Sequence, residues 1–143
     1  MPAACKFCQI AARAIDAAIV FEDERALAFL DHRPLFPGHC LLIPRKHVET
    51  LADLSLEEIS PLFTVAQRLS ASMEQGLGAE GSFVAINNRV SQSVPHLHVH
   101  VVPRKRKDGL RGFFWPRGKY ESGDAMEAVR LKLQQSLESA GRV

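Results

Sequence analysis

The chain has 143 residues, of which 46% are apolar, and a formal net charge of +2 at pH 7. This length predicts one domain with a substantial core, and so small a charge makes nucleic acid an unlikely partner. The longest apolar runs are far too short to cross a membrane, and the N-terminus lacks the organisation of a signal peptide. Three cysteines, two of them spaced Cys-x-x-Cys, favour metal or redox chemistry in a reducing compartment. We therefore expect a cytoplasmic protein.

Short patterned segments follow one another along the chain, separated by turn residues. Residues 5–14 contain few helix breakers and predict a short helix. Apolar runs bounded by polar, Pro or Gly turns predict strands at 19–22, 26–30, 40–44, 83–86 and 96–102. A last amphipathic helix is expected at 122–139, with one apolar side formed by Met126, Val129, Leu133 and Leu137. Neighbouring strands joined by short turns indicate an antiparallel sheet in an α+β fold.

The longest helix is expected to run from a cap at Asp53 or Ser55 to about Glu74. Ser55, followed three residues later by Glu58, has the spacing of a capping box. Apolar residues then recur at helical spacing at positions 56, 59, 62, 63, 66 and 69. This stripe predicts one long helix packed on the sheet.

Three histidines, His96, His98 and His100, alternate with apolar residues. A strand places the three imidazoles on one face and the apolar residues on the other. A neutral imidazole can bind a metal, attack an electrophile or pass a proton to a leaving group. The alternatives are a solvated strand face and a metal patch. On a flat strand the outer two Cα atoms lie about 13 Å apart, which disfavours one metal shared by all three.

The run from His96 to Val102 reads His-φ-His-φ-His-φ-φ, where φ is apolar, and resembles the signature of the histidine-triad (HIT) family of nucleotide hydrolases and transferases. Upstream, residues 21–48 resemble the first half of that family: a strand ending in an acidic residue, a Pro-Gly turn, and a strand ending Ile-Pro-x-x-His. Two separated motifs agree in type and order. The resemblance implies a single HIT domain over residues 1–143, with an N-terminal segment, a core, and a C-terminal aromatic tail and helix (1–18, 19–104 and 105–143).

The resemblance also implies a catalytic role for each histidine. His98, the middle one, attacks the α-phosphorus of a purine nucleotide, and water then hydrolyses the nucleotidyl-histidine and releases the nucleoside monophosphate. A main-chain carbonyl accepts the other ring proton of this histidine in the family. His100 stabilises charge on the phosphate oxygens, and His96 is held beside the nucleophile.

The loop before the triad, residues 87–94, ends in Gln-Ser-Val like its counterpart in the family, but it is shorter and lacks the usual glycines. By resemblance, Gln92 and Ser93 donate hydrogen bonds to the α-phosphate or to the leaving group. Asn87 or Asn88 takes the place of the amide side chain of the family, or the two form an ordinary turn. Arg89 is an added cation that can contact a longer polyphosphate.

Asp31 matches the acidic residue that, in the family, accepts hydrogen bonds from both ribose hydroxyls. A carboxylate suits this role because it offers two oxygens to a vicinal diol. The alternative is a turn-forming aspartate before a proline loop. Phe29 and His32 flank Asp31 and can line the base, although Phe29 is equally well explained as a core residue.

A zinc site is implied by four residues, Cys5, Cys8, His47 and His96. Zinc favours a tetrahedral Cys₂His₂ set with this cysteine spacing. Bacterial members of the family with an N-terminal Cys-x-x-Cys bind zinc through that pair, the Ile-Pro-x-x-His histidine and the first triad histidine. The resemblance therefore implies a closed, structural zinc site. The alternative is two free thiols, with His47 hydrogen-bonded near the triad.

A basic run, residues 104–107, precedes an aromatic cluster at 113–115. The run is typical of a solvated loop, and it also raises the local potential for an anionic substrate. Trp115 begins a Trp-Pro-x-Gly sequence that resembles the C-terminus of the phosphoramidase branch, which reaches into the active site of the partner. We therefore expect a homodimer in which Trp115 helps to complete the substrate pocket of the other chain.

The leaving group is open at this point. The Trp-Pro-x-Gly sequence and Asp31 favour a nucleoside phosphoramidase, whereas Arg89 and the basic run favour a diadenosine polyphosphate hydrolase. The third histidine argues against the nucleotidylyl-transferase branch, in which glutamine occupies that position. An alternative function is a nucleotide-binding protein that senses or scaffolds with little turnover, and the intact triad counts against it.

Overall fold

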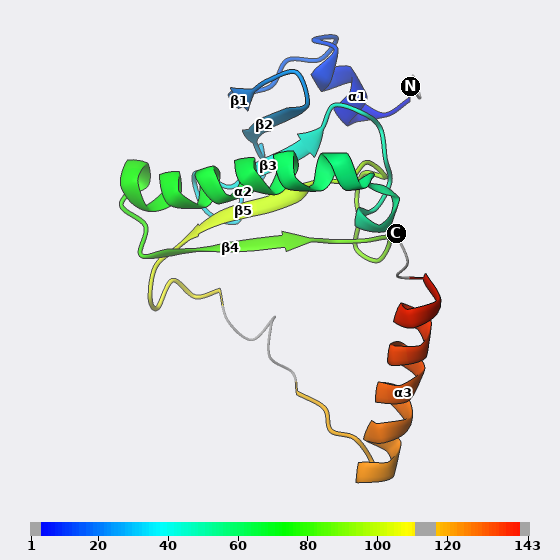
Figure 1. Cartoon of the computed structure of the whole chain (residues 1–143). Coiled ribbons are helices and arrows are strands. Elements are labelled where there is room, and N and C mark those ends of the chain that lie inside the picture. The colour runs from blue at the N-terminus through cyan, green and yellow to red at the C-terminus, as the bar shows by residue number, and fades with distance from the viewer. Residues whose placement is uncertain (1–3, 111–116, 141–143) are drawn as a thin grey trace. The chain divides into compact units, whose positions relative to one another are not determined.

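Five antiparallel strands form one sheet in the computed structural model, which describes residues 4–110 and 117–140 (Figure 1). Their order is β1 (Ile19–Glu22), β2 (Ala26–Leu30), β3 (Cys40–Pro44), β5 (Val99–Arg104) and β4 (Gly81–Ile86). The first three strands have the predicted bounds, and the α+β prediction is confirmed. The chain divides into two units, Met1–Asp108 and Gly109–Val143, and the sheet lies in the first.

One face of the sheet is covered by the long helix α2 (Leu56–Leu77), which packs on β3, β4 and β5. Figure 1 shows this helix running across the sheet. Strand alternation directs Leu42 and Val99 to this face, where they share a core with Leu62 and Leu69. The helix ends at Leu77, three residues later than predicted, and its C-cap is Gly78, whose φ of 68° suits a residue without a Cβ.

The opposite face carries the short helix α1 (Lys6–Ala11). Phe7 and Ile10 of this helix pack against Leu27, Phe29 and Leu41, which alternate with the residues that face α2. The triad histidines alternate with the apolar residues of the α2 core. They therefore belong to the α1 side, which becomes the functional face of the sheet.

The triad strand begins later than the sequence predicts. A strand was expected from His96, but β5 starts at Val99, and the prediction is wrong for the first three residues. The preceding Pro95 has no N–H to give to a ladder. The N–H of His96 donates to the carbonyl of Val94 over 2.8 Å, and that of Leu97 donates to a carbonyl after β3 over 2.7 Å. Local bonds thus replace the regular ladder at this end.

The capping box expected at Ser55 and Glu58 is also wrong. Ser55 is the N-cap of α2, but its hydroxyl makes no capping bond, and the carboxylate of Glu58 accepts a hydrogen bond from Arg25 over 3.1 Å. The box forms instead around the 3₁₀ turn η1 (Leu51–Asp53). There, Asp53 accepts from the main-chain N–H and the hydroxyl of Thr50, over 3.0 and 2.8 Å. These bonds lower the pKa of Asp53.

The second unit contains helix α3 (Gly123–Ala140), close to its predicted bounds. Its first turn is capped by the Ser122 hydroxyl, which accepts from the N–H of Ala125 over 3.0 Å. The predicted apolar stripe is exposed, as shown by Met126, Val129, Leu133 and Leu137. Among the described helices, none is long and apolar enough to cross a membrane.

Candidate functional site

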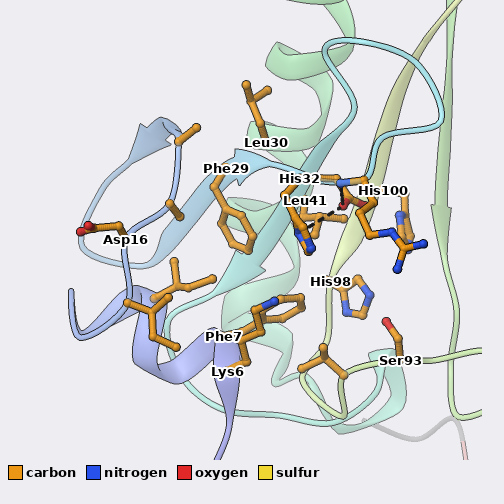
Figure 2. A pocket seen from close by; sticks show the side chains of 17 residues that line it. Lys6, Phe7, Asp16, Phe29, Leu30, His32, Leu41, Ser93, His98 and His100 are labelled. Carbon is orange, nitrogen blue, oxygen red and sulfur yellow. Dashed lines mark hydrogen bonds and ion pairs between the residues drawn. The ribbon is translucent and has the colours of Figure 1, made fainter.

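A cavity of about 780 Å³ opens on the α1 side of the sheet. Figure 2 shows His98, His100 and Ser93 on one side of it, with Phe29 farther away and Asp16 at the opposite end. The walls come from α1, the segment before β1, the end of β2 and the loop before β5. A cavity of this size, with apolar walls and a few convergent polar groups, is typical of a small-molecule site.

His98 presents a lone pair at this cavity. Its Nδ1 lies 2.8 Å from the carbonyl oxygen of His96, so this nitrogen carries the ring proton and donates it. Its Nε2 is consequently unprotonated, and His98 lines the cavity. Burial lowers the pKa of His98 below its ordinary value. A neutral imidazole with an available Nε2 can act as a nucleophile.

His39 determines where His100 carries its proton. The main-chain N–H of Leu35 donates to Nδ1 of His39 over 3.1 Å, so the proton of His39 is on Nε2. That nitrogen donates to Nδ1 of His100 over 2.9 Å. The proton of His100 is therefore on Nε2, which is buried and has no hydrogen-bond partner among the described residues. Burial, followed by the neighbouring His98 and His39, lowers the pKa of His100 to about 4. His100 thus offers a neutral N–H donor.

His96 turns away from this cavity. Its Nε2 donates to the carbonyl oxygen of Pro44 over 2.8 Å, so its Nδ1 holds the lone pair. That lone pair faces two cysteines and a second histidine. Because Nδ1 of His98 is bonded to a carbonyl, the triad imidazoles do not converge on one metal ion. This geometry disfavours an enzyme in which all three histidines share a metal.

The four residues predicted to hold zinc form one cluster. Nδ1 of His96 lies 3.4 Å from Sγ of Cys5, 3.6 Å from Sγ of Cys8 and 3.2 Å from Nδ1 of His47. The sulfur of Cys8 is 3.3 Å from Nδ1 of His47. All four ligand atoms lie within 4.8 Å of one another. A tetrahedral zinc ion with ordinary bond lengths separates two nitrogens by about 3.3 Å and a nitrogen from a sulfur by about 3.6 Å.

The electrostatics of this cluster also suit a cation. Burial, together with Cys5, raises the pKa of the Cys8 thiol to about 11, so that a bound cation is needed to hold the thiolate form. Burial lowers the pKa of His96 to about 4, which leaves the neutral imidazole that a metal requires. The four residues therefore fit a closed Cys₂His₂ zinc site.

A second group, Asp31, His39 and His100, also has the spacing of a metal site. Oδ2 of Asp31 lies 3.8 Å from Nε2 of His39. A metal would need the lone pair of that nitrogen, but it carries a proton because Leu35 donates to Nδ1. Hydrogen bonding accounts for this group without a metal.

The expected ribose and base residues lie beside the histidines. Asp31 and Phe29 both line the cavity, and Oδ1 of Asp31 accepts from the main-chain N–H of Arg33 over 3.0 Å. Phe29 is also almost fully buried, so it is a core residue and a wall of the cavity at once. Phe7 packs edge-on against both Phe29 and His98, with ring centroids 5.4 and 5.0 Å apart.

The loop before the triad places only part of its predicted set at the cavity. Ser93 lines the cavity, and Figure 2 shows its hydroxyl on the side of His98. The amide of Gln92 instead accepts from the N–H of Arg89 over 2.9 Å and donates to a carbonyl over 2.7 Å. Oδ1 of Asn88 accepts from the N–H of Leu51 over 2.8 Å. Asn87, which is exposed, does not line the cavity. In this structure, Gln92 and Asn88 support the loop.

The sequence also predicted roles for Trp115 and Arg89. Trp115 lies outside the described residues. Arg89, the added cation, pairs with Glu49 over 3.3 Å and does not line the cavity. Sequence reasoning gave no role to His39, although a histidine directly after the Pro-Gly turn and before a buried strand was a signal for a site residue.

A five-stranded antiparallel sheet with a row of histidines at a cavity defines a protein of the histidine-triad class. The profile of the HIT domain matches residues 12–107, and the chain belongs to the HIT family. It is 34% identical over 96 residues to an asymmetrical bis(5'-nucleosyl)-tetraphosphatase of Schizosaccharomyces pombe, covering 66% of this chain and 53% of that protein. It is 36% identical over 92 residues to a bis(5'-adenosyl)-triphosphatase of Dictyostelium discoideum, covering 63% of this chain and 62% of that protein. The chain thus spans less than two thirds of these relatives.

A solved structure of a family member shares this fold. The crystal structure of a Zn-bound histidine-triad family protein from Mycobacterium smegmatis matches with a TM-score of 0.71 and 36% sequence identity. The match covers 96% of this chain and 97% of that one.

Proposed function

We propose that this protein is a nucleotidyl hydrolase that cleaves purine nucleotides at the α-phosphate. The observation that carries the proposal is the hydrogen bond from Nδ1 of His98 to the carbonyl of His96, which leaves Nε2 as a nucleophile at the cavity. Nε2 attacks the α-phosphorus, the bond from phosphorus to the leaving group breaks, and the leaving group departs with the electrons of that bond; an amine leaving group takes its proton from solvent water, whereas a phosphate leaves as the anion. Water then attacks phosphorus, the P–N bond breaks, and the nucleoside monophosphate is released with His98 restored.

The neighbouring groups support this chemistry. The Nε2–H of His100 is a donor that has no partner among the described residues, and it suits a phosphate oxygen on which charge develops. The hydroxyl of Ser93 is a second donor. Asp31 offers its carboxylate to the ribose hydroxyls, and Phe29 forms the adjacent wall for the base. The names of the two hydrolase relatives support dinucleoside polyphosphates as one substrate class, and nucleoside phosphoramidates are the other.

We also propose a structural zinc ion bound by Cys5, Cys8, His47 and His96. The distances among the four ligand atoms and the Zn-bound relative support it. A zinc ion there would tie the N-terminal segment to the triad. Phe7, between the two cysteines, would then be held against the ring of His98.

A homodimer is the third part of the proposal. Both β1 and β4 are edges of the sheet, but β1 has four residues and an irregular register with β2, whereas β4 has six residues in regular register with β5. Regular edges favour pairing with a second chain, and irregular ones discourage it. Beside β4, Phe63 and Val84 line an apolar groove and are partly exposed. A second copy that pairs through β4 would cover both.

Incubation of the pure protein with adenosine phosphoramidate, diadenosine triphosphate and diadenosine tetraphosphate tests the proposed reaction. We expect AMP release from at least one of them, measured by chromatography. Tight AMP binding by the wild-type protein without any AMP release would instead support a nucleotide-binding protein with little turnover.

A further inference from the structure

Two cations line the cavity without a carboxylate partner among the described residues, and neither belongs to the triad machinery. Lys6 is the first residue of α1 and lies between the two cysteines of the metal cluster. Arg33 follows the β2 end that carries Asp31. Both side chains are exposed. In Figure 2, the Lys6 side chain extends from the start of α1 toward the cavity.

None of the cations that the sequence suggested for a polyphosphate lines the cavity, and three of them pair with carboxylates elsewhere. Arg89 pairs with Glu49 over 3.3 Å, and neither residue lines the cavity. In the basic run, Arg104 pairs with Asp108 over 2.6 Å. Arg106 pairs with a glutamate at the start of β4 over 2.7 Å. Lys6 and Arg33 therefore supply the positive charge at the wall of the cavity.

A substrate with several phosphates needs positive charge in the part of the cavity near His98 and His100. His98 must be neutral to attack phosphorus, and His100, whose Nδ1 is already bonded to His39, serves as a neutral donor. Asp31 and Asp16 add two carboxylates to the wall. A chain of several phosphates placed here would bring more negative charge than these neutral imidazoles can offset.

We propose that Lys6 and Arg33 form a subsite for an anionic leaving group, so that the preferred substrates carry phosphates beyond the α position. This inference rests on the proposed hydrolase function. Lysine provides a mobile point charge, and the planar guanidinium of arginine can bind a phosphate through two parallel hydrogen bonds. A phosphoramidate, which releases an amine, has no anionic leaving group for them to bind.

The test compares two substrates in matched variants. Lys6→Met and Arg33→Met each remove one charge while keeping most of the side-chain length. We expect each to lower kcat/KM for diadenosine tetraphosphate about tenfold, mainly through KM, and to change kcat/KM for adenosine phosphoramidate less than about twofold. Arg106→Met removes an exposed, paired cation outside the cavity, and it should leave both substrates unaffected.

Two further measurements keep the outcomes distinct. Zinc content is determined for Lys6→Met, because Lys6 lies between the proposed zinc ligands Cys5 and Cys8. If this variant loses zinc, only the kinetics of Arg33→Met are used to test the subsite. A double variant that combines Lys6→Met and Arg33→Met is also measured. Raising the salt concentration should lower kcat/KM for the tetraphosphate more in the wild-type protein than in this double variant. Equal losses on both substrates would overturn the subsite, because the cations would then serve the α-phosphate or the base. Failure of the wild-type protein to release AMP from either substrate would overturn the hydrolase function itself.

Discussion

The chemistry of the site is decided at the scale of single residues by which ring nitrogen of each histidine carries the proton. In His96 and His100 the proton is on Nε2, and in His98 it is on Nδ1. Main-chain groups set all three: the carbonyls of Pro44 and His96 accept directly, and the N–H of Leu35 acts through His39. Three histidines in one run therefore present three different groups: a lone pair on Nδ1 in His96, a lone pair on Nε2 in His98 and an N–H on Nε2 in His100.

The role of His98 is tested by His98→Ala. We expect kcat to fall by at least about four orders of magnitude, because no other residue supplies the covalent nucleophile. The Kd for AMP should change less than about tenfold, since the rest of the cavity is kept. Calorimetry or fluorescence measures the binding, and AMP release measures the rate. Near-normal AMP release by this variant would contradict the mechanism.

The neutral pair formed by His39 and His100 predicts a dependence of stability on pH. Burial lowers the pKa of both in the folded protein, that of His100 to about 4, whereas an unfolded histidine titrates near its ordinary value of about 6.5. Between these values the unfolded chain binds more protons. The free energy of unfolding therefore rises with pH between the folded and the unfolded pKa. The stability that the neutral histidines contribute is lost as the pH falls through this range.

Urea unfolding of the wild-type protein and of His100→Gln between pH 7 and pH 4 checks this expectation. The wild-type protein should lose on the order of 1–3 kcal/mol more than the variant across this range. Carboxylates with a lowered pKa, such as Asp53 and Glu80, are common to both proteins and cancel in the difference. Parallel pH profiles for the two proteins would show that His100 is not a buried neutral group.

At the scale of elements, helix α1 and its N-cap contribute residues both to the Cys₂His₂ cluster and to the wall of the cavity. Cys5 and Cys8 face His96, whereas Lys6 and Phe7, between them, line the cavity. A metal ion bound by the two cysteines would therefore also fix the position of Phe7 against the ring of His98.

A zinc prediction follows from this connection. Protein purified without chelators should contain about one zinc ion per chain, measured by elemental analysis. The double change Cys5→Ser and Cys8→Ser should remove the metal and lower Tm by roughly 10 °C or more, with only a partial loss of activity, because structural zinc contributes folding free energy.

Cys40→Ala is the matched control, since Cys40 is also buried but its thiol donates to the carbonyl of Gly38, away from the cluster. This variant should keep its zinc. Metal-free wild-type protein, prepared under conditions that do not strip zinc, would refute the site.

The loop before the triad adopts left-handed backbone angles at residues other than glycine. The sequence lacks the usual glycines there, and Arg89 and Ser91 adopt φ angles of 69° and 61°. These angles lie in the left-handed region that glycine normally occupies. The hydrogen bond from Arg89 N–H to Gln92 holds this strained path, and it explains why the Gln92 amide is turned into the loop.

At the scale of the whole molecule, we expect a homodimer with twice the 15.8 kDa mass of one chain. Val84→Lys places a charge on the regular edge strand β4 and should yield the monomer mass by light scattering at micromolar concentration. Val20→Lys, on the irregular edge strand β1, should leave the dimer intact. A wild-type protein with the monomer mass would remove the dimer from the proposal.

The predicted contribution of Trp115 to the partner's pocket has a separate test. Trp115→Ala should raise KM for one leaving group more than for another, without unfolding the protein. Unchanged kinetics on all three substrates would mean that Trp115 does not contribute to the pocket.

The sequence by itself determined the bounds of three of the five strands and the opposite faces on which the histidines and the core residues lie. The bounds of β1, β2 and β3 and the separation of the histidines from the α2 core follow from the period of two, which is a local property of an extended chain. The four residues of the Cys₂His₂ cluster were predicted for another reason, namely the resemblance to zinc-binding members of the family, because a Cys-x-x-Cys pair by itself is weak evidence for a metal site.

The tertiary structure alone decided which atoms meet. The proton position of His100 depends on groups as distant in sequence as Leu35 and His39, and that of His96 depends on the carbonyl of Pro44, because strand register brings β3 beside β5. Which cations pair with carboxylates and which line the cavity likewise depends on the fold: the loop sequence suggested Arg89, which pairs with Glu49, whereas Lys6 and Arg33 line the cavity. Side-chain contacts between distant segments arise from packing, and a local sequence pattern does not contain them.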